Sequence, residues 1–268
     1  MEVLGRIGVS VLVVLSLTVG ISHGKGTVEK IYNNGMAYAT EGKLKEAKEE
    51  FEKALKLDSF CSPAEESLQR VEDILNRKIK RRTGIYLFRG IVYRNRGDFV
   101  NGIGEINKAI TINPGYAPAY NDRGETYGLK GRHDRAILDY TKALKINPRY
   151  TVAFINRGVS YYHKGQHNRA ISDYTKAIEI NPRSALAYTN RGQAYAVKGQ
   201  YDHAISDYNK ALKINPKDVV TYNNRAISYY LKKEYENAWE DVHKMESFGI
   251  QAHPEFLSVL REASGRQK

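Results

Sequence analysis

Hydrophobic and small residues recur along this chain at a fixed spacing that predicts pairs of short helices. Gly90, Gly124, Gly158, Gly192 and Ala226 follow one another at intervals of 34 residues. If this small residue is position 8, units begin at 83, 117, 151, 185 and 219, and an earlier unit begins at 28. At 100° per residue, positions 4, 8 and 11 share one stripe of a first helix, helix A. Positions 17, 20, 24, 27 and 28 share one stripe of a second, helix B.

Other positions of the unit also repeat, and they mark where the two helices end. Position 11 is tyrosine in all six units: Tyr38, Tyr93, Tyr127, Tyr161, Tyr195 and Tyr229. Position 15 is glycine at Gly131, Gly165 and Gly199, where helix A is expected to stop. Asn-Pro pairs such as Asn181-Pro182 end helix B, because proline cannot continue it. Each unit is thus predicted to be a helical hairpin that buries its apolar face only by stacking on its neighbours.

The pattern resembles the tetratricopeptide repeat, whose 34-residue period and small-Gly-Tyr-Ala-aromatic-Ala-Pro signature match it position by position. The resemblance covers five contiguous units over residues 83–252 and a separate first unit at 28–61. It implies an all-α fold, a right-handed α-solenoid of stacked helical hairpins. It also implies a protein-binding scaffold rather than an enzyme.

Two segments depart from the repeat. Residues 62–82 are inserted between units and predict an extra helix with a basic end, starting at the capping signature of Ser62, Pro63 and Glu65. This helix either packs between units or continues into the next one, and its apolar stripe consists of Leu68, Val71, Leu75 and Ile79. Residues 253–268 predict a C-terminal capping helix and tail, with Phe256, Leu257 and Leu260 covering the apolar edge of the last unit.

Residues 1–24 have the pattern of a targeting segment. Arg6 precedes an apolar run from Ile7 to Ile21, which is shorter than the roughly 20 residues that a membrane-spanning helix needs. Ser22 and Gly24 are small residues suited to a cleavage site after Gly24. We expect an exported protein, periplasmic or secreted, after signal cleavage. The alternative is a membrane-anchored protein that keeps this segment as an N-terminal helix.

Composition limits the chemistry. The only cysteine, Cys61, cannot form a disulfide within the chain, and the formal net charge of +12 permits anionic partners without identifying one. Phosphate-binding glycine loops, HExxH and GxSxG are absent from the sequence. We therefore expect no catalytic residues, no cofactor and no metal site, and we do not expect a nucleic-acid partner.

The candidate binding residues lie on the side of helix A that faces away from helix B, at positions 2, 5, 6, 9, 12 and 13. We call this side the groove face, because in tetratricopeptide arrays it lines the concave groove. Its candidate residues are Asp122, Asn156, Tyr162, Asn190, Gln193, Asn224 and Tyr230. An asparagine amide donates and accepts at once, which suits the backbone of an extended peptide. The arrangement is similar to the asparagine ladder of O-linked N-acetylglucosamine transferase.

The leading hypothesis is thus a non-enzymatic protein–protein interaction scaffold in the cell envelope that binds an extended peptide segment. Position 2 is never basic, so the carboxylate clamp of heat-shock co-chaperones is not built here. The alternative is an electrostatic binder of an anionic polymer or surface through a lysine at position 26 of every unit. Arginine at position 7 and an acid at position 23 recur together, and we interpret them as ion pairs between helices.

Overall fold

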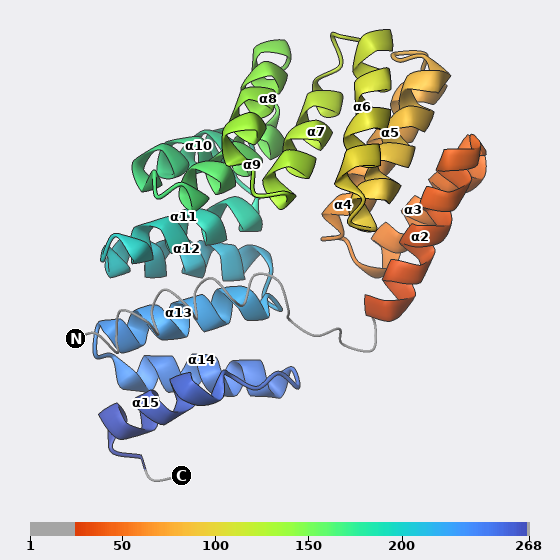
Figure 1. The fold of residues 1–268 in the computed structure, drawn as a ribbon. Coiled ribbons are helices and arrows are strands. Elements are labelled where there is room, and N and C mark those ends of the chain that lie inside the picture. The colour runs from red at the N-terminus through yellow and green to blue at the C-terminus, as the bar shows by residue number, and fades with distance from the viewer. Residues whose placement is uncertain (1–24, 267–268) are drawn as a thin grey trace. The chain divides into compact units, whose positions relative to one another are not determined.

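The computed structural model describes residues 25–266, and within this range the secondary structure consists of α-helices and turns. The helices are α2 (Lys25–Glu41), α3 (Leu44–Leu57), α4 (Ser62–Leu75), α5 (Arg81–Asn95), α6 (Phe99–Ile112), α7 (Ala117–Leu129), α8 (His133–Ile146), α9 (Thr151–His163), α10 (His167–Ile180), α11 (Ala185–Val197), α12 (Tyr201–Ile214), α13 (Val219–Leu231), α14 (Tyr235–Ser247) and α15 (Pro254–Ser264). Successive helices pair into hairpins, and α4 and α15 lie outside this pairing (Figure 1). The predicted all-α solenoid of helical hairpins is confirmed.

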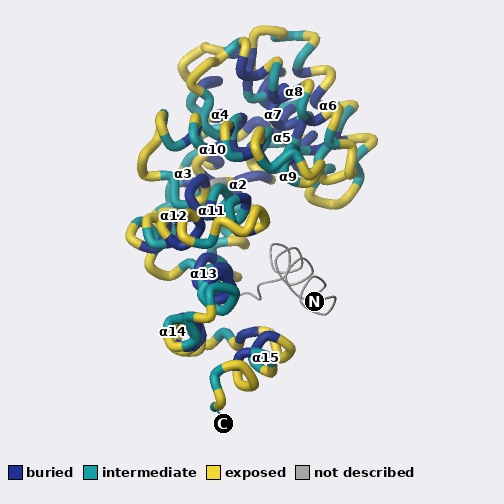
Figure 2. The backbone as a smooth tube through the Cα atoms, turned by 90° about the vertical axis from the view of Figure 1, so that its left-hand side faces the viewer, coloured by how far each residue is buried: buried dark blue, intermediate teal, exposed yellow. Residues whose placement is uncertain are grey.

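The described chain divides into two compact parts, an N-terminal part (25–156) and a C-terminal part (157–266), with the division inside α9. The N-terminal part has a core built from α2 to α7, which includes Phe51, Phe88 and Ile106. The C-terminal part has a core at its end, which includes Trp239 and Phe256. Figure 2 shows that buried residues concentrate on the helices and that the turns between helices are mostly exposed.

Within each hairpin, a small residue at position 8 of helix A lets a large side chain of helix B lie against the helix A backbone. A Cβ atom added to Gly124, Gly158 or Gly192 would lie 2.6–2.7 Å from a tyrosine ring carbon of the same hairpin. These rings are Tyr140, Tyr174 and Tyr208, all at position 24 and all nearly fully buried. Position 8 is therefore small because a ring occupies the space that a side chain would need.

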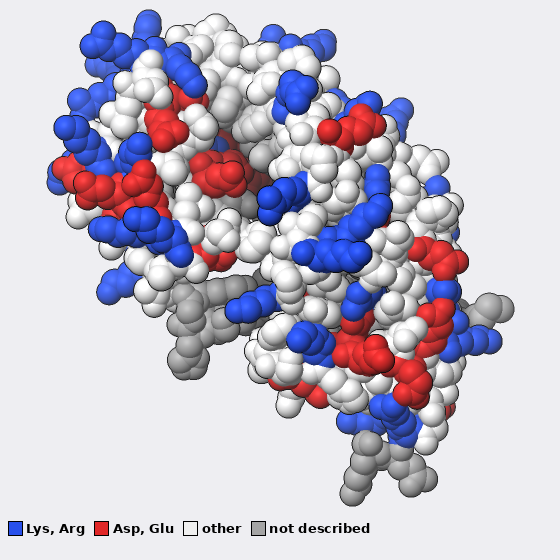
Figure 3. Space-filling model, turned by 180° about the vertical axis from the view of Figure 1, so that it is seen from behind, with Lys and Arg blue, Asp and Glu red and all other residues white. Residues whose placement is uncertain are grey.

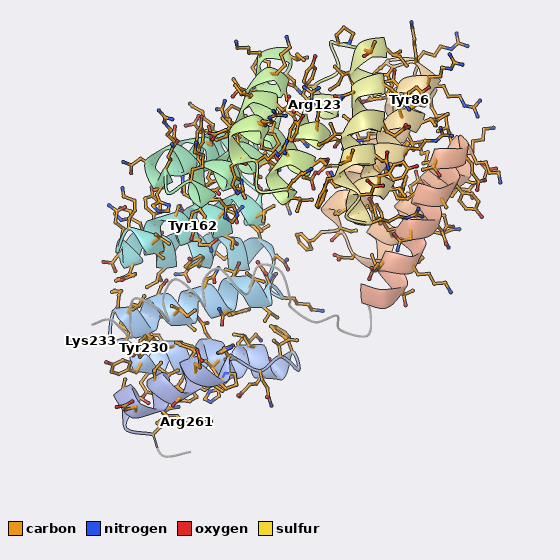
Figure 4. The ribbon with its side chains drawn as sticks, viewed as in Figure 1. Tyr86, Arg123, Tyr162, Tyr230, Lys233 and Arg261 are labelled. Atoms are coloured by element: carbon orange, nitrogen blue, oxygen red, sulfur yellow. The ribbon has the colours of Figure 1, made fainter. Side chains whose placement is uncertain are left out.

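The turn between helix A and helix B needs a left-handed backbone. Gly131, Gly165 and Gly199 have φ angles of 73°, 70° and 73°. Lys233 takes the same place in the last unit with φ 64°, so this unit holds a lysine in a conformation that favours glycine (Lys233 is labelled in Figure 4).

The C-terminal helix α15 covers the last hairpin, as predicted. Phe256 is 2% exposed, and its ring meets the Tyr230 ring edge to face with centroids 5.9 Å apart. Leu260 is fully buried, and Trp239 Nε1 donates a hydrogen bond to Ser264 Oγ at 3.1 Å. The apolar edge that a further repeat would cover is thus closed by the cap.

The inserted segment forms a helix of its own rather than continuing into the next unit. The helix α4 ends at Leu75, and Arg77 has a φ of 58°, which breaks the chain direction before α5 begins at Arg81. Ile79, predicted to belong to the helical stripe, lies in this turn and is 5% exposed. The apolar residues of the inserted segment therefore pack into the core from two places, the helix α4 and the turn that follows it.

The predicted targeting segment, residues 1–24, lies outside the described residues. Among residues 25–266, none of the helices is both long enough and apolar enough to cross a membrane.

We predict that Gly158→Ala destabilises the fold. Its Cβ atom would lie 2.6 Å from Tyr174 Cε1, and overpacking of this kind typically costs about 1–3 kcal/mol. The free energy of unfolding, measured by denaturant titration followed by circular dichroism, should fall by this amount. The matched control is Gly104→Ala in α6, where a Cβ atom would meet nothing within 4 Å. The control should be neutral or stabilising, because alanine is the better helix former. Equal stabilities for the two variants would contradict the packing described here.

Candidate peptide-binding surface

The inserted helix α4 lies across the groove face of the N-terminal part. Ser67 Oγ of α4 donates to Met36 Sδ at 3.7 Å, and Met36 is position 9 of α2. On α5, a Cβ atom at Gly84, position 2, would overlap Ile74 Cδ1 of α4. Positions 5, 6 and 9 of α5 are apolar, at most 2% exposed, and share one core with Val71 and Ile74: they are Leu87, Phe88 and Ile91. The chain therefore covers this stretch of groove face with its own helix.

A buried ion pair joins α4 to α7. Arg70 Nη2 donates to Asp122 Oδ1 at 2.5 Å and to Glu66 Oε2 at 3.2 Å. Arg70 is 4% exposed and Asp122 is fully buried. Burial raises the pKa of the Asp122 carboxyl to about 6, and the charge of Arg70 opposes this rise. Because a buried carboxylate needs a cationic partner, Arg70 fixes α4 in place on α7.

A second contact between α4 and the start of α7 lies beside this pair. Tyr116 Oη donates to Asp73 Oδ2 at 2.9 Å, and Lys78 Nζ lies 3.4 Å from Asp73 Oδ1. A cavity of about 380 Å³ opens here between α4 and the loops before α7 and α9. Its lining includes Glu66, Arg70, Asp73, Lys78, Tyr116 and Tyr150. The charged groups of this cavity pair with one another, Glu66 with Arg70 and Asp73 with Lys78.

The N-terminal part therefore uses two of the predicted groove residues internally. The expectation that Asp122 lies on an open groove is wrong, because Arg70 covers and binds its carboxylate. Asn156 is half-buried, and its Nδ2 donates to Oδ1 of the buried Asn121 at 3.1 Å. The amide of Asn156 thus ties α9 to α7.

The groove face of the C-terminal part is most accessible on α11. Residues at positions 2, 6, 9 and 13 of this helix form a stripe that we call the α11 stripe, consisting of Leu186, Asn190, Gln193 and Val197. Leu186 is 53% exposed and Val197 is 37% exposed, and the two amide side chains are half-buried. Two of the predicted residues, Asn190 and Gln193, thus lie between two exposed aliphatic side chains.

The two predicted tyrosines, labelled in Figure 4, are half-buried in aromatic contacts at the ends of their helices. The Tyr162 ring lies 5.2 Å from that of His167, and the Tyr230 ring lies 6.0 Å from that of Tyr235. Burial raises the pKa of both tyrosine hydroxyls. These tyrosines at position 12 thus pack against position 17 across the turn, and only part of each ring faces outward.

Asn224, the last predicted amide, is 3% exposed, so its side chain is not accessible as expected for the groove. Its helix α13 is flanked on both sides. Thr221 Oγ1 lies 2.6 Å from Thr189 Oγ1 of α11, and Tyr230 packs on Phe256 of α15. Accessible groove amides in this part are therefore those of α11.

The predicted pairing of arginine at position 7 with an acid at position 23 is confirmed in four hairpins. Both carboxylate oxygens are engaged in Arg123–Asp139, Arg157–Asp173, Arg191–Asp207 and Arg225–Asp241, with shortest distances of 2.7, 2.8, 2.7 and 2.5 Å. In the unit at 83, Glu105 instead pairs with Lys108 at 2.5 Å, and Arg89 is exposed. These arginines hold hairpins together rather than facing a ligand.

Comparison with known proteins agrees with this architecture. Models of the tetratricopeptide repeat match residues 28–60, 117–150, 185–218 and 207–240, and a TPR repeat model matches 158–199, together more than half of the chain. The chain belongs to the tetratricopeptide repeat family. This is a family of protein-interaction scaffolds that are generally non-catalytic. No curated protein matches the chain at a significant level.

Solved structures with this fold are similar over most of their own length. One of them is the crystal structure of MamA, whose sequence is 25% identical to this chain. The alignment covers 59% of this tetratricopeptide repeat protein and 92% of the MamA chain, with a TM-score of 0.54. A tetratricopeptide repeat protein from Parabacteroides merdae is 21% identical, with 88% and 84% of the two chains covered and a TM-score of 0.55. PilF of Pseudomonas aeruginosa is 13% identical, with 85% and 94% covered and a TM-score of 0.57.

The 34-residue period does not predict that α4 covers the groove face, although the sequence carries a signal for it. In the unit at 83, groove positions 2, 5, 6 and 9 are Gly84, Leu87, Phe88 and Ile91, an apolar set that no solvent-facing groove would need.

Within residues 25–266, no group of three or more His, Cys, Asp or Glu side chains is arranged to hold a metal ion.

We predict that Arg70→Met lowers the free energy of unfolding by about 3–5 kcal/mol, because it leaves the Asp122 carboxylate buried without its cation. Adding Asp122→Leu should restore most of the loss, since an apolar pair needs no compensation. Denaturant titrations of the single and double variants measure this. Lys43→Met, which removes an exposed pair with Glu41, is the control and should change little. A double variant no more stable than Arg70→Met would contradict the assignment.

Proposed function

We propose that this tetratricopeptide repeat protein binds an extended segment of another protein on the groove face of its C-terminal part, centred on the α11 stripe. The observation that carries the proposal is the regularly spaced set of exposed aliphatic and half-buried amide side chains on α11. The exposed leucine and valine on this helical face would be covered by apolar side chains of a bound segment. The amides between them match the alternating donors and acceptors of a peptide backbone.

The shape of this face favours an extended segment over a helix. In the N-terminal part, α4 approaches α5 closely because position 2 is Gly84, where a Cβ atom would overlap Ile74. In the C-terminal part, position 2 is Leu186 on α11 and Val220 on α13. These side chains occupy the space that a closely packed helix would need, and an extended chain is thinner than a helix.

The proposal includes a location in the cell envelope, and its support is the sequence of residues 1–24. N-terminal sequencing of the chain recovered from its own cells tests it. A first residue of Lys25 agrees with cleavage after Gly24, and an intact N-terminus in the membrane fraction agrees with the anchored alternative. Recovery of the intact chain from the cytoplasm would contradict both.

The alternative, an electrostatic binder of an anionic polymer, is not favoured by the surface. Each position-26 lysine has a local partner. Three pair with glutamates, as Lys53–Glu50, Lys108–Glu105 and Lys176–Glu179. The others lie over aromatic rings, as Lys142 over Tyr120, Lys210 over Tyr188 and Lys244 over Phe248. Figure 3 shows both basic and acidic side chains on the face that it displays.

We predict that Asn190→Ala weakens binding of the partner about two- to thirteenfold, because each lost hydrogen bond is worth roughly 0.5–1.5 kcal/mol. The partner is first recovered by affinity capture and mass spectrometry, and its binding segment is then titrated by calorimetry. The control is Gln200→Ala, an exposed amide in the same part outside the groove-face positions. If the control weakens binding and Asn190→Ala does not, the partner binds elsewhere and the proposal is wrong.

A further inference from the structure

The groove face of the C-terminal part carries no Asp, Glu, Lys or Arg side chain. Its positions are Val159, Tyr162, His163, Leu186, Thr189, Asn190, Gln193, Ala196, Val197, Val220, Asn223, Asn224, Ile227, Tyr230 and Leu231. Five of these positions are buried, namely Thr189, Ala196, Asn223, Asn224 and Ile227. Charged residues make up 27% of the chain, so some would be expected among the ten positions that are half-buried or exposed. Their absence is a property of this surface rather than of the chain.

Some of the same positions in the N-terminal part are charged. Arg94, at position 12 of α5, donates to Glu125, at position 9 of α7, with 2.7 Å between Nη1 and Oε2. Asp122, at position 6 of α7, binds Arg70. Charge is thus tolerated by the repeat at these positions, so its exclusion from the C-terminal part needs a separate cause.

We infer that the segment bound on the α11 stripe is uncharged and apolar, and this inference rests on the proposed function. A charged side chain laid on this face would lose hydration and find no counter-charge on the groove-face positions. Aliphatic side chains of the segment would instead cover Leu186 and Val197, which are 53% and 37% exposed. Half-buried Val220 and Leu231 extend the apolar contact onto α13.

A chain with net charge +12 attracts acidic segments at long range, and this attraction makes the inference testable. If general electrostatics selected the partner, an acidic segment would bind best and salt would weaken it. If the groove face selects the partner, an uncharged segment binds best, and salt has little effect because no charges are in contact.

The test uses the full chain and synthetic peptides of roughly ten residues, which span about 33 Å when extended. One peptide contains only aliphatic, aromatic and amide residues, and two derivatives carry Lys or Glu at two central positions. Binding is measured by fluorescence polarisation between about 0.05 and 0.5 M salt. The uncharged peptide should bind at least tenfold more tightly than either derivative, with less than a twofold change across the salt range.

The substitution Val197→Glu places an acidic side chain on the α11 stripe, where it can pair with the Lys derivative of the peptide. It should weaken binding of the uncharged peptide and strengthen binding of the Lys derivative, reversing their order at low salt. Leu138→Glu is the control, because Leu138 is a 71% exposed leucine on α8 at position 22, outside the groove face. This control should leave the order of the peptides unchanged.

Failure of this inference is distinguishable from failure of the proposed function. Tighter, salt-dependent binding of the Glu derivative that Asn190→Ala still weakens would overturn the inference and leave the groove proposal standing. Binding of every peptide unaffected by both Asn190→Ala and Val197→Glu, or binding of none, would overturn both.

Discussion

The close approach of helix A to helix B at position 8 is the constraint on which the rest of the structure depends. A tyrosine ring at position 24 occupies the volume in front of Gly124, Gly158 and Gly192. Where the glycine is replaced, the partner changes with it: Ala226 in the last unit faces a helix B with Val242 at position 24, fully buried. In the unit at 83, Gly90 faces Ile106, and Gly102 at position 20 brings the two backbones together. Where position 8 carries the larger residue alanine, position 24 thus carries a smaller side chain than tyrosine.

The position-7 arginine extends this local constraint to neighbouring units. Arg123 binds Asp139 of its own hairpin, and its Nη1 donates to Asn107 Oδ1 of the preceding hairpin at 2.8 Å. Arg191 binds Asp207 in the same way, and its Nη1 donates to Thr175 Oγ1 at 3.0 Å. The guanidinium of Arg191 also lies over the Tyr188 ring, 5.7 Å from its centroid. One side chain therefore orients helix A against its own helix B and against the unit before it. The direction of the groove face follows from that orientation.

The sequence predicts the fold well because the relevant contacts are local and repeated. Glycine at position 8, tyrosine at position 24 and the Arg–Asp pair all act within one 34-residue unit or its neighbour, so their spacing alone identifies them. The accessibility of groove residues depends on contacts that spacing does not encode. Asp122 and Asn190 occupy the same position 6, yet Asp122 is buried under Arg70, which lies 52 residues earlier in the chain. Asn224 is buried on a helix flanked by α11 and α15. The inserted helix and the cap can be predicted from their own sequences. Because each occurs only once, no period indicates which groove-face positions they cover.

The two parts therefore put one repeated surface to different uses. On α5, groove-face positions 5, 6 and 9 became interior, because Leu87, Phe88 and Ile91 joined the core with α4, and on α7 Asp122 acquired a buried cation. Burial of that kind fixes the occupant, because removing α4 would expose Leu87 and Phe88 and leave Asp122 uncompensated. On α11, the equivalent positions kept exposed aliphatic side chains and half-buried amides without charge. Exposing to solvent a surface that holds no ion pair and no large apolar cluster costs little free energy. Such a surface suits an occupant that arrives from another molecule and leaves again.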